Sequence, residues 1–129
     1  MPHPNETRIR DTFAAFMRGD VGPAQSLFDP NVVTHVFRHG PTPGDLKGLD
    51  AFLEWGAELA ELSGGTFREE LLEVVADDTT GFQRGLFTAA RNGSIIEDQS
   101  VNVYRFRGGR IVETWIFFGN PKGFDDFWS

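Results

Sequence analysis

The 129-residue chain contains no cysteine, few basic residues and no long apolar run. The absence of cysteine excludes a disulfide framework and a thiolate zinc site, suits a reducing cytosol, and leaves only His and carboxylates as metal ligands. We expect no closed structural metal site and no cofactor. The 12 Lys and Arg residues stand singly against 19 Asp and Glu residues, which gives a formal charge of -7. An acidic surface repels phosphate backbones and anionic lipid, so nucleic acid is a poor candidate partner.

No stretch approaches the ~20 apolar residues of a membrane span. The first ten residues, MPHPNETRIR, also lack the apolar core of a signal segment. We therefore expect a soluble, cytoplasmic protein that does not insert into a membrane. The length suits one domain over residues 1–129, and no internal repeat, low-complexity tract or linker interrupts it.

The first half of the chain carries mostly helical patterns. Asn5 is a suitable cap for the first helix, and Gly64 and Gly65 supply a left-handed stop for the longest one. The expected elements are helices over residues 5–20, 23–30 and 48–65 and one β-branched strand over residues 32–39.

The second half changes to an alternation with a period of two, which is typical of strands. Turn sequences at Asp77-Asp78, Asn92-Gly93 and Gly108-Gly109 join the strands into a meander. The expected strands cover residues 66–77, 80–91, 94–107 and 110–120. Helices followed by a meander indicate an α+β fold, in which a curved antiparallel sheet packs on the helices.

The hairpin turns determine which strand residues share a face, provided that each turn has two residues. Thr88 then lies opposite Glu97, and Glu97 lies opposite Asn120. The more apolar face is expected to point inward and collects Phe82, Arg84, Leu86, Thr88, Glu97, Gln99, Val101, Val103, Val112, Thr114, Ile116, Phe118 and Asn120. The outer face collects Gln83, Gly85, Phe87, Asp98, Ser100, Asn102, Glu113, Trp115 and Phe117. A bulge in either hairpin would reverse these assignments locally.

Several fragments carry a family resemblance: VVTHVFRHGPTPGDLKGLDAF, LSGGTFREELLEVVAD, GGRIVETW and the terminal DDFWS. With the order and lengths of the elements, they resemble the SnoaL-like branch of the nuclear transport factor 2-like superfamily, which has a cystatin-like fold. The resemblance implies a cone-shaped, curved antiparallel sheet wrapped around three N-terminal helices, an apolar cavity open at one end and commonly a homodimer. It does not fix a reaction, because members include isomerases, epoxide hydrolases, polyketide cyclases, dehydratases and non-catalytic binding domains.

The resemblance also points to two candidate catalytic residues. His35 matches a strand histidine of the branch, and Asn120 stands where the branch has a general-base aspartate. A neutral amide lacks the basicity of a carboxylate, so the cyclase mechanism of the family has no base at this position. For His35 the sequence leaves two roles open: proton transfer, or a structural position in the core or at the rim where its hydrogen bonds are satisfied. For Asn120, binding of a water or substrate carbonyl and the capping of a turn are both open.

Glu97 is the candidate replacement for the missing base, because a carboxylate on an inward face can have a raised pKa; the alternative is a solvated strand end. Arg84 on the same face would bind an anionic ligand or form a structural ion pair. The other expected ligand-binding residues are Gln99, Trp55, Phe118 and Thr88.

The remaining His and acidic residues give no metal site. His3 and His39 lie in terminal or loop sequence without a ligand-spaced partner. In Glu69-Glu70 the two side chains point to opposite faces of a strand, and this pair is expected to be solvated, like Asp77-Asp78 and Asp125-Asp126.

Trp115 and Phe117 are aromatic residues on the expected outer face, where exposed aromatic side chains often mark a protein contact, and they support a homodimer. The leading hypothesis is a cavity that binds a small, largely apolar molecule of polyketide-like or steroid-like structure, with an isomerase, cyclase or hydrolase reaction. The alternatives are a non-catalytic ligand carrier and a protein-interaction domain whose cavity is filled.

Overall fold

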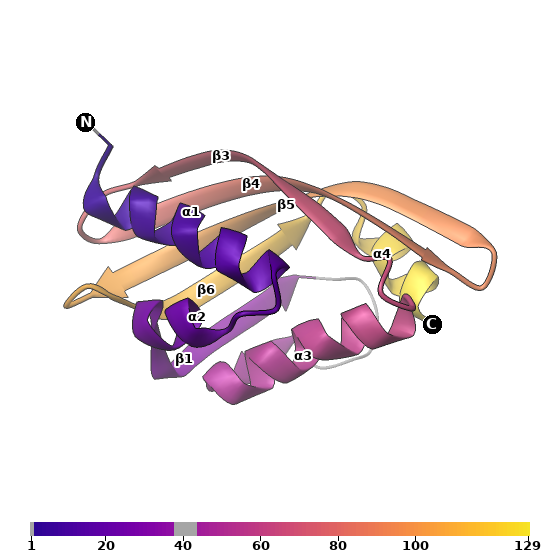
Figure 1. The fold of residues 1–129 in the computed structure, drawn as a ribbon, viewed down its shortest axis with the longest axis horizontal. Helices are drawn as coiled ribbons and strands as arrows, with labels where there is room; N and C mark the ends of the chain where they lie inside the picture. The colour runs from indigo at the N-terminus through magenta and orange to yellow at the C-terminus, as the bar shows by residue number, and fades with distance from the viewer. Residues whose placement is uncertain (1, 38–43) are drawn as a thin grey trace.

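The computed structural model describes residues 2–37 and 44–129, which form four helices and six strands (Figure 1). The helices are α1 (Pro4–Met17), α2 (Gly22–Leu27), α3 (Leu49–Leu62) and α4 (Pro121–Trp128). The strands are β1 (Phe28–Phe37), β2 (Asp45–Lys47), β3 (Arg68–Ala76), β4 (Thr80–Arg91), β5 (Ser94–Arg107) and β6 (Arg110–Phe118). Within the described residues, no helix is long and apolar enough to cross a membrane.

The six strands form one curved sheet in the order β2-β1-β6-β5-β4-β3. Its neighbours are antiparallel except β1 and β6, which run parallel because the chain passes through α3 and the whole meander before it returns beside β1. The sheet is therefore mixed, not antiparallel throughout as expected. It curves around α1, α2 and α3, which lie on its concave side (Figure 1), and this arrangement confirms the α+β class.

The predicted helices begin within one residue of the observed ones, but each ends three residues earlier than expected, and α2 ends at Leu27 and not at Pro30. Gly64 and Gly65 have φ angles of 62° and 80°, which confirms the left-handed stop after α3. The expected cap of α1 was wrong. His3 caps that helix by accepting the Asn5 N–H at Nδ1 (3.1 Å), whereas the buried Asn5 side chain donates to the backbone oxygen of Asp77 (3.0 Å).

The β4–β5 hairpin has the predicted register. Asn92 and Gly93 adopt φ angles of 52° and 79°, as a tight two-residue turn requires, and Arg91 pairs with Ser94. Thr88 lies opposite Glu97, also as predicted.

The β5–β6 hairpin contains a bulge that the two-residue turn did not predict. Arg107 pairs with Arg110, but the register shifts between Arg105 and Phe106, so that Val103 lies opposite Trp115. Because of the extra residue on β6, side chains of β5 and β6 that the two-residue turn places on the same face of the sheet lie on opposite faces. The inward assignment was consequently wrong for β4 and β5 but right for Thr114, Ile116 and Phe118 of β6.

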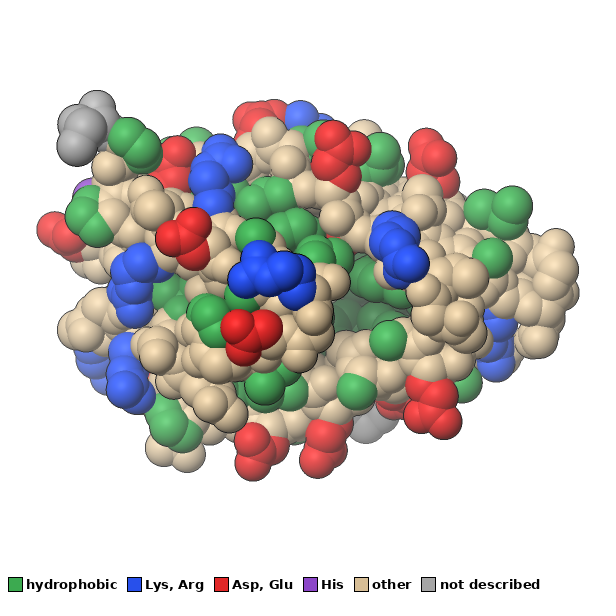
Figure 2. Space-filling model, in the orientation of Figure 1, with side chains coloured by type: hydrophobic (Ala, Val, Ile, Leu, Met, Phe, Trp, Pro, Cys, Tyr) green, Lys and Arg blue, Asp and Glu red, His purple; other side chains and the backbone are tan. Residues whose placement is uncertain are grey.

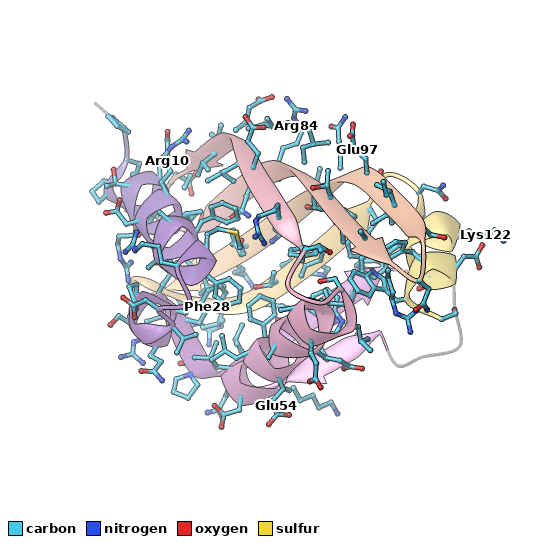
Figure 3. The ribbon with its side chains drawn as sticks, turned by 45° about the vertical axis from the view of Figure 1, so that its right-hand side comes forward. Arg10, Phe28, Glu54, Arg84, Glu97 and Lys122 are labelled. Carbon is cyan, nitrogen blue, oxygen red and sulfur yellow. The ribbon has the colours of Figure 1, made fainter. Side chains whose placement is uncertain are left out.

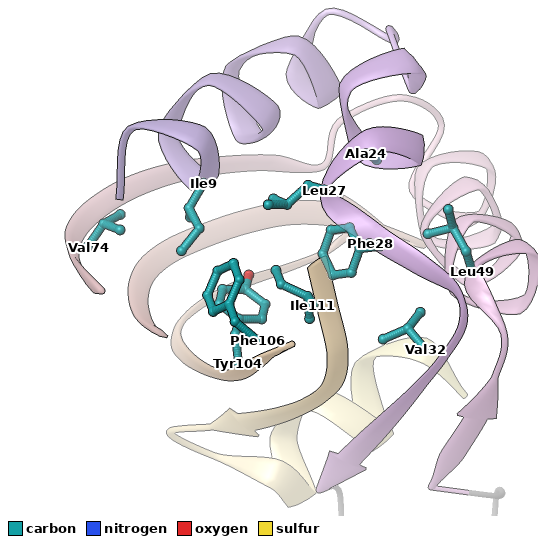
Figure 4. Close-up of a cluster of buried hydrophobic side chains, with 10 residues drawn as sticks. All are labelled: Ile9, Ala24, Leu27, Phe28, Val32, Leu49, Val74, Tyr104, Phe106 and Ile111. Atoms are coloured by element: carbon teal, nitrogen blue, oxygen red, sulfur yellow. The ribbon is translucent and has the colours of Figure 1, made fainter. Parts of the chain in front are cut away.

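Buried side chains form two separate clusters. The first lies at the α2 end of the sheet (Figure 4) and contains Ile9, Ala24, Leu27, Phe28, Val32, Leu49, Val74, Tyr104, Phe106 and Ile111. The second lies beneath α4 and is centred on Leu59, Phe87 and Phe124. The interior is thus packed at both ends.

Helix α4 is an element that the sequence reasoning did not predict, since those residues were interpreted as a tail. Asn120 caps it, Pro121 occupies its first turn, and Phe124 and Trp128 recur at helical spacing on its inner side. Phe124 stacks on Phe118 with ring centroids 3.9 Å apart. This helix therefore covers the end of the sheet opposite α2, as Figure 1 shows.

Candidate functional site

A cavity of about 630 Å³ lies between the concave face of the sheet and the helices α1 and α3. Its walls are mainly apolar and include the aromatic residues Phe13, Phe16, Phe52, Trp55, Phe67 and Phe87. A hollow lined by hydrophobic side chains is visible on the face of the molecule shown in Figure 2. The volume and the apolar lining are those of a small-molecule site.

Polar side chains are gathered on one side of this cavity. They come from three neighbouring strands: Glu69 from β3, Gln83 from β4, and Ser100, Asn102 and Tyr104 from β5. Pairing of Gly85 with Ser100 and of Gln83 with Asn102 places these groups beside one another on the sheet. The cavity therefore has an apolar wall on the helices and a polar strip on the sheet.

Glu69 points inward because it pairs with Phe87, a fully buried residue on the concave face. Its carboxyl lies against Gly85, where an added Cβ would be only 3.2 Å from the Glu69 Oε2 atom. Within residues 2–37 and 44–129, no hydrogen bond or ion pair joins this carboxyl to another group. Burial raises the pKa of Glu69 from 4.5 to about 7, because the charged form loses its hydration there.

Tyr104 connects two amides of the polar strip. Its hydroxyl donates to Gln83 Oε1 (2.8 Å) and accepts from Asn102 Nδ2 (3.2 Å). Burial raises the pKa of Tyr104, so the phenol stays protonated and can donate its one hydrogen throughout the physiological range. Gln83 and Tyr104 are 6 % and 5 % exposed, which shows that this network is part of the interior.

Two of the residues predicted from sequence line the cavity, Trp55 of α3 and Phe118 of β6. Four others do not, because the β6 bulge places them on the outer face of the sheet: Arg84, Thr88, Glu97 and Gln99. Arg84 forms an ion pair with Glu73 and donates to Gln99 Oε1 (2.9 Å). Figure 3 shows Arg84 and Glu97 on the side of the sheet away from the helices. The predicted inward position of these four residues was wrong.

His35 also lies on the outer face, so it does not reach the cavity. Its Nδ1 is 3.0 Å from Asp45 Oδ1, its Nε2 is 2.7 Å from Glu113 Oε2, and its ring stacks on Trp115. The hydrogen bond to Glu113, with a further one to Asp45, raises the pKa of His35. The sequence left two roles open for His35, proton transfer and a structural position with its hydrogen bonds satisfied. The geometry supports the structural position, because both ring nitrogens are hydrogen-bonded to side chains of β2 and β6.

Asn120 does not point into the cavity; it is exposed and caps α4. Its Oδ1 accepts the N–H of Gly123 (2.9 Å), and its own backbone N–H donates to Asp98 Oδ2 (2.8 Å). The predicted inward orientation was wrong, and the capping alternative is the one observed.

The sequence reasoning missed Glu69, Gln83, Ser100, Asn102 and Tyr104. Glu69 was taken as one of a solvated acidic pair, although it shares strand parity with Leu71, which packs into the core. This shared parity with Leu71 could have identified Glu69 as an inward-facing residue from the sequence alone. The β4 and β5 residues were missed because the bulge is not visible in the sequence.

Among the described residues, no group of three His, Cys, Asp or Glu side chains is arranged to hold a metal ion. His3 is paired instead with Asp78 (2.9 Å), and His39 lies outside the described residues.

The profile of the SnoaL-like domain matches residues 9–114, which is most of the chain. The chain belongs to the SnoaL-like family. Among solved structures, this SnoaL-like protein is similar to Bal32a, from a soil-derived mobile gene cassette, with a TM-score of 0.88 and 30 % identity over 97 % of this chain and 96 % of the other.

Two more distant structures share the fold. TerC, co-crystallized with polyporic acid, has a TM-score of 0.80 and 19 % identity, with 97 % of this chain and 98 % of TerC covered. IdmH, a putative polyketide cyclase from Streptomyces antibioticus, has a TM-score of 0.74 and 20 % identity, with 91 % and 93 % covered.

Proposed function

We propose that the cavity binds a small, largely apolar molecule with oxygen substituents, and that Glu69 transfers a proton to or from it in an isomerase, cyclase or hydrolase reaction. The observation that carries the proposal is the position of the Glu69 carboxyl in the wall of a mainly apolar cavity, where burial raises its pKa to about 7. Near neutral pH such a carboxyl is present in both protonation states, so it can act as an acid or a base. The relation to a putative polyketide cyclase and to TerC with its bound polyporic acid favours polyketide-like substrates.

The charge distribution supports an uncharged substrate. The basic residue among the described cavity-lining residues, Arg68, donates from its guanidinium to the backbone oxygens of Gly65 and Phe67. The polar strip otherwise offers amide and hydroxyl groups, which bind carbonyl and hydroxyl oxygens. Burying a phosphate or carboxylate beside the Glu69 carboxyl would be unfavourable, because the exposed Arg68 is the one cation among the described lining residues.

Glu69 and Glu70 offer a matched pair of variants for the test, because they are adjacent on β3 but face opposite sides of the sheet. Turnover is measured against pH with polyketide-like, steroid-like and epoxide substrates, including polyporic acid. We expect Glu69→Gln to lower kcat by at least about 100-fold, the usual contribution of a general acid or base, with Glu70→Gln unchanged. Equal activity of the two variants on a turned-over substrate would refute the role of Glu69.

A ligand carrier is the second candidate, and the isolation of the Glu69 carboxyl favours it. A catalytic base is commonly oriented by a neighbouring group, and no hydrogen bond to Glu69 is found in the described residues. Native mass spectrometry distinguishes the two functions: a carrier retains a bound compound unchanged, whereas an enzyme releases a product of altered mass or retention time. The third alternative, an interaction domain with a filled interior, is disfavoured by the cavity of about 630 Å³.

The outer face of the sheet is the surface proposed for contact with a second copy of this chain. Phe37 and Phe117 stack there with centroids 4.6 Å apart and remain 46 % and 41 % exposed. Two ion pairs on this face, Arg84 with Glu73 and Arg105 with Glu113, neutralise part of its charge. Because the whole chain carries a charge of -7, this neutralisation reduces the repulsion between two copies that meet through this face.

A further inference from the structure

Gln83 and Asn102 form a directly opposed pair of amides in the cavity wall. They are register partners on β4 and β5, and both line the cavity. Opposed side chains on antiparallel strands have Cβ atoms about 4.5–5.5 Å apart, so a bound molecule can contact both amides through neighbouring substituents.

The hydroxyl of Tyr104 lies against both amides, and it has only one hydrogen to donate. It gives this hydrogen to the Gln83 oxygen, so the N–H groups of the Gln83 amide remain as donors for a ligand. It receives a hydrogen from the Asn102 nitrogen, which leaves the Asn102 oxygen as the acceptor. If both amides were flipped, the donor and the acceptor would exchange places, but the two amides would still present opposite polarity.

We propose that Tyr104 is a positioning residue that sets the specificity of the cavity, by holding Gln83 and Asn102 as one donor beside one acceptor. The matching ligand carries a hydroxyl next to a carbonyl, as in a hydroxy ketone or an enolised diketone. A diketone offers two acceptors and leaves the acceptor amide facing a carbonyl oxygen, which is unfavourable. This inference rests on the proposed binding of a ligand in the cavity, and it adds the pattern of oxygen substituents that the ligand must have.

Three probes with one carbon skeleton test the pattern: benzoin (carbonyl and hydroxyl), benzil (two carbonyls) and benzoin methyl ether (carbonyl and a blocked hydroxyl). Dissociation constants are measured by isothermal titration calorimetry on the whole chain. We expect wild type to bind benzoin about tenfold more tightly than either other probe, because one hydrogen bond is lost and one buried acceptor is left unpaired.

Tyr104→Phe removes the hydroxyl but keeps the ring, and it frees both amides to turn independently. We expect the preference for benzoin to fall to within about twofold in this variant, because each amide can then adapt to either probe. Asn102→Leu removes the acceptor amide at similar volume, and its loss of the same preference provides a second test if Tyr104→Phe folds poorly. As a control, Phe52→Leu alters the apolar wall and should weaken binding of all three probes by a similar factor.

Each outcome is decisive. Equal binding of the three probes by wild type, or a preference retained by both Tyr104→Phe and Asn102→Leu, overturns the inference and leaves ligand binding in the cavity intact. No binding of any probe to wild type contradicts the proposed binding function itself, and the inference falls with it.

Discussion

At the scale of single residues, the chemistry of the cavity depends on the carboxyl of Glu69. The side chain occupies the concave face because its strand neighbour across the sheet, Phe87, is buried, and because Gly85 has no side chain in its place. The raised pKa means that folding opposes ionisation of this group. Activity and stability therefore both respond to the titration of this carboxyl.

The first prediction concerns the stability of Glu69→Gln. The unfolded carboxyl titrates near 4.5 and the folded one near 7. As pH rises through this interval the unfolded chain loses its proton first, so the native state becomes less stable by up to about 3 kcal/mol. Gln cannot ionise, so the variant should exceed wild type in free energy of unfolding at pH 8 and match it at pH 4. Chemical denaturation at both pH values checks this. An equal difference at both pH values would exclude titration as the cause.

Asn120 gives the second prediction at this scale. Asn120→Ala removes the acceptor for the Gly123 N–H and should cost about 1 kcal/mol of unfolding free energy. Asn120→Asp keeps an acceptor at the cap and should leave both stability and turnover near wild type. Urea denaturation and the turnover assay measure the two effects. A large gain of activity in Asn120→Asp would show that this position belongs to the reaction instead.

At the scale of elements, α1, α3 and the four strands of the meander could be predicted from sequence, because each has a clear apolar period and ends at a Gly, Asn or Asp. The side chains facing the cavity could not. One additional residue in β6, between the pairs Arg105–Glu113 and Phe106–Ile111, reverses the relation between the faces of β5 and β6. Since the Gly108-Gly109 turn looks the same with or without a bulge, residue alternation alone cannot locate it. Tertiary packing decides the register.

One edge of the sheet also depends on a side chain of β1, His35, which joins the edge strand β2 to β6. Its pKa is raised above the ordinary 6.5, first by the hydrogen bond to Glu113, and that same bond lowers the pKa of Glu113 below 4.5. The contribution of protonated His35 is complete below pH 6.5 and disappears as pH rises through its folded pKa. The contribution of ionised Glu113 is complete above pH 4.5 and disappears as pH falls through its folded pKa. Both are present together between about pH 4.5 and 6.5.

The third prediction follows from that interval. His35→Gln should reduce the free energy of unfolding by up to about 1 kcal/mol at pH 5.5, a typical value for a partly exposed ion pair. The reduction should become smaller at pH 9, where His35 is neutral in wild type as well. Denaturation curves at the two pH values provide the comparison. A loss that is the same at both would mean that His35 contributes by packing on Trp115 and not by charge.

At the scale of the whole molecule, the sheet separates a concave side with the cavity from an outer side with exposed aromatic rings. The proposed self-association of the outer side gives the fourth prediction. Phe117→Asp should shift the chain from dimer to monomer in analytical ultracentrifugation, because it buries a charge in the contact. Leu62→Asp at the end of α3 is the matched control, with 38 % exposure against 41 % for Phe117, and should leave the mass unchanged. A wild-type chain that sediments as a monomer at all concentrations would contradict the proposal.

The most direct test of the central claim is a titration of the Glu69 side chain in the intact protein. Carbon-13 NMR of the glutamate carboxyls, with Glu69→Gln used to assign the resonance and Glu70 as the internal reference, measures its pKa without requiring any substrate. A buried carboxyl in an apolar cavity predicts a midpoint at about pH 7. A midpoint near the ordinary 4.5 would show that Glu69 is hydrated and would contradict its role as the acid or base of this site.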